Sequence, residues 1–391
     1  MNSRFRRVML INILYSFASN LIHPITPTLI TNLNLPDRMF GLLFAAMATG
    51  SFLFSAFWGR LADRRGSRIV LVLSLIGYAI GQFVFGFTEN PGIMLAARFF
   101  GGSATGGTAV ALLTSVVDAS APEERAKNLS AYAALQGVFC AAGYFSGGMM
   151  GMLGIRLVFV VHCSLLLLCA ALTHFLLPAG VTENAPREAK QGRAPLSEML
   201  KMLTAPMALF FLGVVFSTFS TMGFDNAFNF YIRKVFGFPS SVNGAIKAVT
   251  GLLGLFANLV INRWIAKRFE NSKALTTVLL LCAATLFCST FMEHAYLFIG
   301  VNIAFYMCNA IYIPIQQALM AQEKQAHFGI LSGIYNASRA IGMVAGSFSA
   351  GYLFEVGAKL PFYTQVAGFL LAAGATVMAQ YLGRGAKKAA Q

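Results

Sequence analysis

Long apolar segments recur along the chain, separated by short stretches that hold charged and turn-forming residues. A segment of about 20 apolar residues is typical of a transmembrane helix, which closes its own backbone hydrogen bonds inside the bilayer. The segments are continuous rather than alternating, which favours helices over a membrane β-barrel. Spans are predicted at about 8–31, 38–59, 69–88, 92–117, 126–150, 154–178, 207–231, 240–262, 274–292, 295–320, 328–354 and 360–382.

Composition supports an integral membrane protein. Of the 391 residues, 57% are hydrophobic and 11% are charged, whereas a soluble domain carries roughly 25% charged residues. The six cysteines fall inside apolar runs, so we interpret them as core residues rather than disulfides or metal ligands. The first apolar stretch continues to about Ile30 without a small-residue cleavage site, which predicts a first span rather than a signal peptide. The stretch "SNLIHPITP", with Pro24 and Pro27, predicts a bend in that span.

The distribution of basic residues predicts the orientation in the membrane. With the N-terminus inside, 21 of the 29 lysines and arginines lie in inside segments and five in outside loops. This bias predicts a multi-pass protein of the inner or plasma membrane with both termini in the cytoplasm. It explains most of the net charge of +15 and favours contact with anionic lipid over nucleic-acid binding.

The chain also repeats itself at an offset of 203 residues. Residues 131–148 align with 334–351, and the same offset aligns Gly41 with Gly244 and Arg60 with Arg263. One register across several spans predicts two parallel repeats of six helices, related by an axis along the membrane normal. The expected domains are 1–178 and 207–391, joined by a cytoplasmic linker at 179–206.

The loop "GRLADRRGSR", between the second and third spans, resembles the motif G-x-L-A-D-R-x-G-R-[RK] of the major facilitator superfamily. Ser67 departs from the pattern, whose matched residues are Gly59, Leu61, Ala62, Asp63, Arg64, Gly66 and Arg68. The resemblance covers essentially the whole chain and implies two six-helix bundles around a cavity that opens alternately to either side. It also implies that the loop latches the cytoplasmic side of the two halves.

Elementary chemistry is compatible with such a latch. Glycines at 59 and 66 let helix ends approach closely and let the backbone turn. The arginines can contact acids such as Asp118, and Asp63 can face a helix N-terminus. The simpler alternative is that the loop supplies only topology-determining charge. The repeat copy at 262–273 keeps the basic residues but lacks the aspartate and both glycines.

Two further segments match family motifs in part. Arg98 and Gly102 fit the pattern R-x-x-Q-G, with Gly101 in place of the glutamine. The resemblance implies a role for Arg98 in proton transfer, while the alternative is an arginine that snorkels to the surface. Gly143, Gly147 and Gly148 fit part of the drug/proton antiporter pattern G-x-x-x-G-P-x-x-G-G, with Tyr144 replacing the proline. Glycines at this spacing also allow close helix contact whatever the substrate.

Asp225 is the only acid well inside a predicted span. A low-dielectric environment disfavours the charged carboxylate, so this residue is a candidate proton carrier. Its setting, with Phe224 and Tyr231, resembles the F-[DE]-x-x-x-x-x-Y pattern of twelve-span multidrug/proton antiporters, although Asn309 stands where some of them carry a second acid. Lys247 has a matching depth, so it either exchanges with a proton or substrate at Asp225, forms a static ion pair with it, or does not touch it.

The remaining intramembrane charges bear on the substrate. Arg98, Lys247 and Arg339 outnumber Asp225, which favours an anionic or zwitterionic substrate over a simple cation. Arg339 aligns with Gln136 in the repeat. The candidate cavity residues are Arg339, Gln136, Asn309, Asn226, Asn229 and Phe224.

Enzymatic chemistry finds little support, because no phosphate-binding G-x-x-x-x-G-K is present and the five histidines lack metal-ligand spacing. We therefore expect no catalytic residues, cofactor or metal. The predicted function is proton-coupled export of small amphipathic or drug-like compounds by a monomeric transporter, with protons and membrane lipids as its other partners. The alternatives are an importer or exchanger of an organic anion or a sugar, a lipid-linked flippase, and a non-transporting sensor or scaffold.

Overall fold

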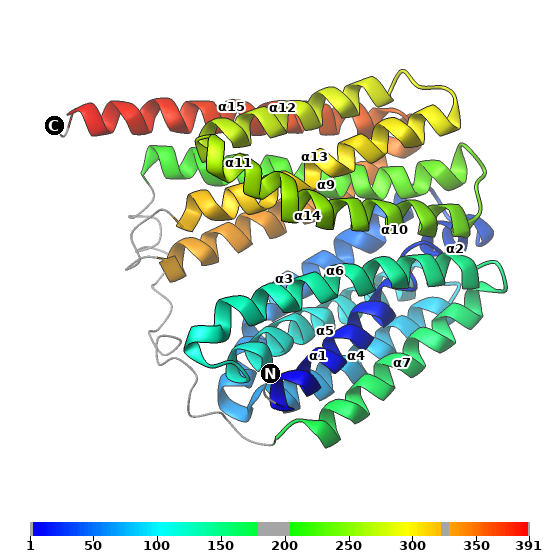
Figure 1. Ribbon diagram of the computed structural model, residues 1–391. Helices are drawn as coiled ribbons and strands as arrows, with labels where there is room; N and C mark the ends of the chain where they lie inside the picture. Colours follow the sequence, from blue (N-terminus) through cyan, green and yellow to red (C-terminus); the bar gives the residue numbers. More distant parts are fainter. Residues whose placement is uncertain (1–2, 179–203, 322–327, 390–391) are drawn as a thin grey trace. The chain divides into compact units, whose positions relative to one another are not determined.

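The computed structural model describes residues 3–178, 204–321 and 328–389, and these residues form helices joined by short turns (Figure 1). The N-terminal helices are α1 (Ser3–Asn20), α2 (Thr26–Asn32), α3 (Arg38–Arg65), α4 (Ser67–Phe87), α5 (Pro91–Asp118), the short η1 (Pro122–Glu124), α6 (Arg125–Met150) and α7 (Ile155–Leu176). The C-terminal helices are α9 (Ala205–Lys234), α10 (Ser240–Phe256), η3 (Ala257–Ile261), α11 (Asn262–Arg268), α12 (Asn271–Ser289), α13 (Ala295–Ala321), α14 (Phe328–Val356) and α15 (Leu360–Ala389).

The predicted all-α membrane fold is confirmed, and each predicted span lies on helical structure. Within the described residues, nine helices are long and apolar enough to cross a membrane by length and composition. The segments of α1, α6 and α14 are not among them. The predicted linker at 179–206 lies almost entirely outside the described residues.

The first span is broken, as its prolines predict. α1 ends at Asn20 and α2 begins at Thr26, with Pro27 in its first turn. In the intervening turn the His23 ring stacks on Phe44 at 5.8 Å and on Tyr144 at 5.5 Å between ring centroids. Aromatic neighbours therefore position this histidine.

The helices form two compact units. The first comprises the described residues of Met1–Pro186 together with Asn229–Leu252, and the second those of Arg187–Phe228 and Leu253–Gln391. The helices α9 and α10 therefore contribute to both units. These units differ from the two halves that the repeat predicts, and the predicted domain limits stay a prediction.

In the first unit, α5 packs against both α3 and α4, while α1 packs against α6 and α7. The start of α5 is fixed locally: the Asn90 side chain accepts hydrogen bonds from the backbone nitrogens of Gly92 and Ile93 at 2.9 and 3.2 Å, and Pro91 needs no such partner. Residues such as Val70, Leu75 and Leu166 are fully buried in the core of this unit.

The end of the α9–α10 hairpin packs on the N-terminal helices of the same unit. The Lys234 ammonium lies 3.1 Å from the Asp37 carboxylate, and the Ser240 hydroxyl donates to the Gly148 carbonyl at 3.0 Å. Gly148 on α6 crosses Gly244 on α10 so closely that a Cβ on Gly148 would lie 3.0 Å from the Gly244 Cα. Glycine is required at this crossing because side chains would push the helices apart.

In the second unit, α12 packs against α13 and α15. A smaller apolar cluster, which includes Phe211, Met320 and Leu331, lies where α9 begins and α13 ends. One feature departs from a uniform span: η3 is a single π-helical turn between α10 and α11. Such turns interrupt the regular hydrogen-bond ladder of a long helix.

Candidate functional site

Asp225 lies on α9 and is half-buried. The Tyr306 hydroxyl of α13 donates a hydrogen bond of 2.8 Å to its Oδ1 atom. A carboxylate only accepts hydrogen bonds, whereas a protonated carboxyl group also donates one. Uptake of a proton by Asp225 therefore changes what this carboxyl group can do at the contact between α9 and α13.

The contact with Tyr306 is the first rung of a polar ladder between the two antiparallel helices. Four residues earlier on α9, the Thr221 hydroxyl lies 2.8 Å from both the Asn309 Oδ1 and the Tyr312 hydroxyl. These groups satisfy one another inside an otherwise apolar bundle.

A third rung lies one further turn along α9. The Gln316 amide of α13 donates to the Ser217 hydroxyl at 2.9 Å, and both residues are buried. Ser217, Thr221 and Asp225 recur every four residues and therefore share one face of α9. The ladder, defined by these three residues and their partners, runs from a half-buried carboxyl group into the interior of the second unit.

An aromatic cluster surrounds the upper rung. The Phe224 ring lies 4.2 Å from Phe305 and 5.3 Å from Tyr306, and Phe228 stacks on Phe298 at 5.9 Å, all between ring centroids. Phe224 is fully buried in this cluster, so its ring supports Tyr306 and presents no accessible surface in this structure. The prediction that Phe224 lines a cavity is not supported by this placement.

Two other predicted cavity residues lie on the helices of the second unit. Asn226 is buried, and its amide donates to the Ser347 hydroxyl of α14 at 2.8 Å, which ties α9 to α14. Arg339 of α14 is half-buried, with its guanidinium carbon 5.9 Å from the centroid of the Tyr335 ring. Arg339 thus provides a partly accessible positive charge in this unit.

Arg98 of α5 is 1% exposed, so it does not snorkel to the surface. Its guanidinium donates to the Thr26 hydroxyl at 3.2 Å and to the Met47 sulfur at 3.4 Å. Its guanidinium carbon lies 3.9 Å from the centroid of the Phe85 ring and 5.6 Å from that of Phe44. No carboxylate among the described residues lies within ion-pair distance, so cation–π contacts and one hydroxyl offset part of the cost of burying the charge.

Three more predicted site residues belong to the first unit. Lys247 is buried on α10, Gln136 is half-buried on α6, and Asn229 is buried near the end of α9. The Asn229 Oδ1 atom has no hydrogen-bond partner among the described residues. Asp225 and Lys247 belong to different units, and their predicted pairing stays a prediction.

The loop that carries the family motif is a tight turn between α3 and α4. Gly66 has φ +87° and ψ +154°, a conformation that a side chain disfavours. Ser67, which departs from the motif, accepts a hydrogen bond of 3.1 Å from the Ser115 hydroxyl and so joins the start of α4 to α5. The Arg68 guanidinium lies 3.3 Å from the His174 Nδ1 atom at the end of α7.

Other parts of the loop differ from expectation. Asp63 and Arg64 are exposed and form no hydrogen bond or ion pair with the residues that the structure describes, so the expected latch contacts are not seen there. At Gly59 no described atom lies within 4 Å of the position a Cβ would take, so close helix approach does not explain this glycine. Asp118 is half-buried at the end of α5.

Sequence reasoning missed Tyr306, Thr221, Tyr312 and Gln316. The signal that marks them is the spacing of polar residues within apolar helices. Ser217 and Thr221 precede Asp225 at intervals of four, and Tyr306 precedes Asn309 by one helical turn. A tyrosine among so many aromatic residues does not stand out unless its helical face is compared with that of the acid.

Comparison with known proteins gives a consistent family. The sequence matches the Major Facilitator Superfamily over residues 8–347. Multidrug resistance protein 1 of Bacillus subtilis (strain 168) is 23% identical over 358 residues, which cover 91% of each chain. Quinolone resistance protein NorA of Staphylococcus aureus (strain COL) is 22% identical over 367 residues, which cover 92% of each chain.

A solved structure of a bacterial homologue of the human lysosomal transporter Spinster matches with a TM-score of 0.76 at 15% identity, over 96% of each chain. At this identity the likeness shows the fold alone.

Proposed function

The chain belongs to the major facilitator superfamily of membrane transporters, and from this premise we propose that it exports small amphipathic or drug-like compounds in exchange for protons. The observation that carries the proposal is Asp225, a half-buried carboxyl group bound by Tyr306. Its surroundings are a fully buried aromatic cluster, in which the neutral form of a carboxyl group is favoured.

The coupling follows from the chemistry of Asp225. A proton from outside neutralises the carboxylate when the transport pathway opens outward, and the neutral protein returns to the inward-open state. Substrate then leaves on the opposite stroke, because the same pathway cannot open to both sides at once. In this proposal both termini are cytoplasmic, the protein acts as a monomer in the plasma or inner membrane, and Arg98 and Lys247 modulate the charge balance.

The relatives support the choice of substrate class. Two proteins named for multidrug and quinolone resistance match the chain over nine-tenths of its length. Their identity of 22–23% leaves room for a different substrate.

A second candidate rests on the three intramembrane cations. Arg98 and Lys247 are buried and Arg339 is half-buried, against the single carboxylate of Asp225. This balance favours import or exchange of an organic anion, because a positive pathway attracts negative substrates. A sugar transporter or a lipid-linked flippase has less support from the described residues.

The experiment that tests both candidates uses everted membrane vesicles that contain the wild type or Asp225→Asn. The vesicles are energised to an acid interior, and uptake of cationic, neutral and anionic compounds is followed together with proton release. We expect the wild type to accumulate a compound while it discharges the gradient, and Asp225→Asn to do neither. Equal behaviour of the two proteins would reject proton coupling at Asp225 and favour anion exchange.

A further inference from the structure

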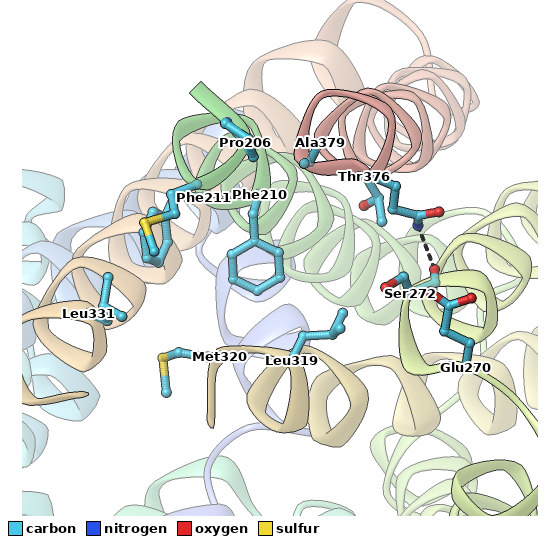
Figure 2. Close-up of a pocket in the computed structure, with 13 residues that line it drawn as sticks. Pro206, Phe210, Phe211, Glu270, Ser272, Leu319, Met320, Leu331, Thr376 and Ala379 are labelled. Atoms are coloured by element: carbon cyan, nitrogen blue, oxygen red, sulfur yellow. Dashed lines mark hydrogen bonds between the residues drawn. The ribbon is translucent and has the colours of Figure 1, made fainter. Parts of the chain in front are cut away.

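A pocket of about 300 Å³ lies at the end of the second unit where α9 and α12 begin and α13 ends (Figure 2). The helices α9, α13, α14 and α15, together with the turn before α12, supply its walls. None of the residues considered in the sequence analysis lies in it. Small-molecule sites in proteins typically measure about 300–1,000 Å³, so the space suits a small ligand.

The pocket has two chemically different walls. Phe210, Phe211, Met320 and Leu331 form one side, and Figure 2 shows them facing the space opposite Thr376, Ser272 and Glu270. Aromatic rings and flexible methionines suit varied apolar shapes. An occupant must therefore combine an apolar body with a polar head.

The polar wall offers acceptors rather than donors. The Gln380 amide nitrogen already donates to the Ser272 carbonyl at 2.8 Å and to the Thr276 hydroxyl at 3.3 Å. The Thr376 hydroxyl donates to the Ala372 carbonyl at 2.8 Å.

The amide oxygen of Gln380 and the two oxygens of Glu270 are acceptors by nature. The Lys273 ammonium, 3.6 Å from one Glu270 oxygen, is an exposed pair on the solvent side. Such a wall recognises a head group that donates hydrogen bonds and carries positive charge.

We propose that this pocket binds an amphipathic ammonium compound. Its apolar body lies against Phe210, Phe211 and Met320, and its ammonium group faces Glu270 and Gln380. The inference rests on the proposed function, whose substrate class it narrows. With both termini cytoplasmic, the pocket lies at the end from which an exporter takes up its substrate.

The test is photolabelling of the full chain in lipid vesicles with an alkylammonium that carries a diazirine on its alkyl chain. Labelled residues are mapped by mass spectrometry, with and without excess unlabelled alkylammonium. We expect competed labels within 206–211 and at 319–320. An alcohol with the same diazirine-bearing chain should label these positions weakly, because it lacks the charge.

Matched variants make the test specific. Glu270→Gln should lower the competed labelling about fivefold, the strength of an exposed charge pair, whereas Glu293→Gln at the opposite end of α12 should not. Leu319→Trp should abolish labelling by filling the pocket, whereas Leu281→Trp on the exposed face of α12 should not. Labelling of Glu270→Gln and Leu319→Trp equal to that of their controls, or no competed label at these positions, overturns the proposal.

The same vesicles separate this proposal from proton-coupled export. Competed labelling that responds to Glu270→Gln, in a protein that neither transports nor releases protons, supports the pocket and rejects export. Proton-coupled transport without competed labelling at 206–211 and 319–320 rejects the pocket and leaves export standing.

Discussion

At the scale of single residues, Tyr306 holds Asp225 in its charged form. A hydrogen bond donated to a carboxylate stabilises the charge, and the bond measures 2.8 Å. The ring of Tyr306 is held in turn by Phe224 and Phe228. The aromatic cluster therefore positions the hydroxyl that controls how readily Asp225 takes up a proton.

Tyr306→Phe should move the pH at which coupled transport is half-maximal upward by about one unit, since a hydrogen bond to a charged group is worth about 1.5 kcal/mol. Without the donor, the carboxyl group is protonated at a lower proton concentration. The measurement is proton-coupled uptake as a function of pH in vesicles. Tyr363→Phe, at an exposed tyrosine of α15, is the control. An unchanged pH profile for Tyr306→Phe would contradict a role for this hydroxyl at the proton site.

Asp225 was predictable because an acid inside an apolar span is rare and costly. Its partner was not, because many aromatic residues of the chain fill core positions with no polar role. The buried setting of Arg98 was equally hidden. The sequence contains the arginine but does not reveal that Thr26, Met47 and Phe85, from three other helices, converge on it.

At the scale of helices and turns, the two glycines of the motif loop have different roles. Gly66 adopts a positive φ at the end of α3, whereas Gly59 lies inside α3 with open space around it. The same residue type therefore marks a turn at one position and a neutral helical site at the other.

Gly66→Ala should destabilise the protein by about 1–3 kcal/mol, because the new side chain is forced into a disfavoured conformation. Gly59→Ala should be neutral or stabilising by roughly 0.5–1 kcal/mol, because alanine favours the helix. Thermal unfolding of the purified proteins in the same detergent measures the difference. Equal destabilisation by both changes would mean that Gly59 takes part in a contact outside the described residues.

The spans themselves were predictable from the apolar runs, and the prolines revealed the break between α1 and α2. The π-helical turn η3 was not, because the stretch 257–261 is a continuous part of an apolar run. An apolar pattern reports that a segment is helical and buried, but it does not report how many residues form each turn.

At the scale of the whole molecule, the sequence repeat groups the helices by ancestry, while the compact units group them by contact. The repeat assigns α9 and α10 entirely to the C-terminal half. Contacts such as Lys234 with Asp37 and Ser240 with Gly148 assign the hairpin at Asn229–Leu252 to the first unit. A repeat offset cannot predict such contacts, because they depend on side chains that the two halves do not share.

Gly244→Ala should lower the transport rate about tenfold, since its Cβ would lie 2.5 Å from the Tyr144 carbonyl oxygen and the backbone must shift. Overpacking of this kind costs about 1–3 kcal/mol. Gly300→Ala on α13, where no described atom lies within 4 Å of the Cβ position, is the control. Transport rates are compared at equal protein levels. If Gly244→Ala transports like Gly300→Ala, the crossing of α6 and α10 does not take part in transport.

The division of α9 between two units has a mechanical consequence. The boundary falls between Phe228 and Asn229, less than one helical turn from Asp225. On α10 it falls between Leu252 and Leu253, four residues before η3. A helix that is anchored at both ends in different bodies bends when those bodies shift. Flexure of α9 would therefore reach the carboxyl group directly, so that the elasticity of one helix ties the motion of the protein to the binding of a proton.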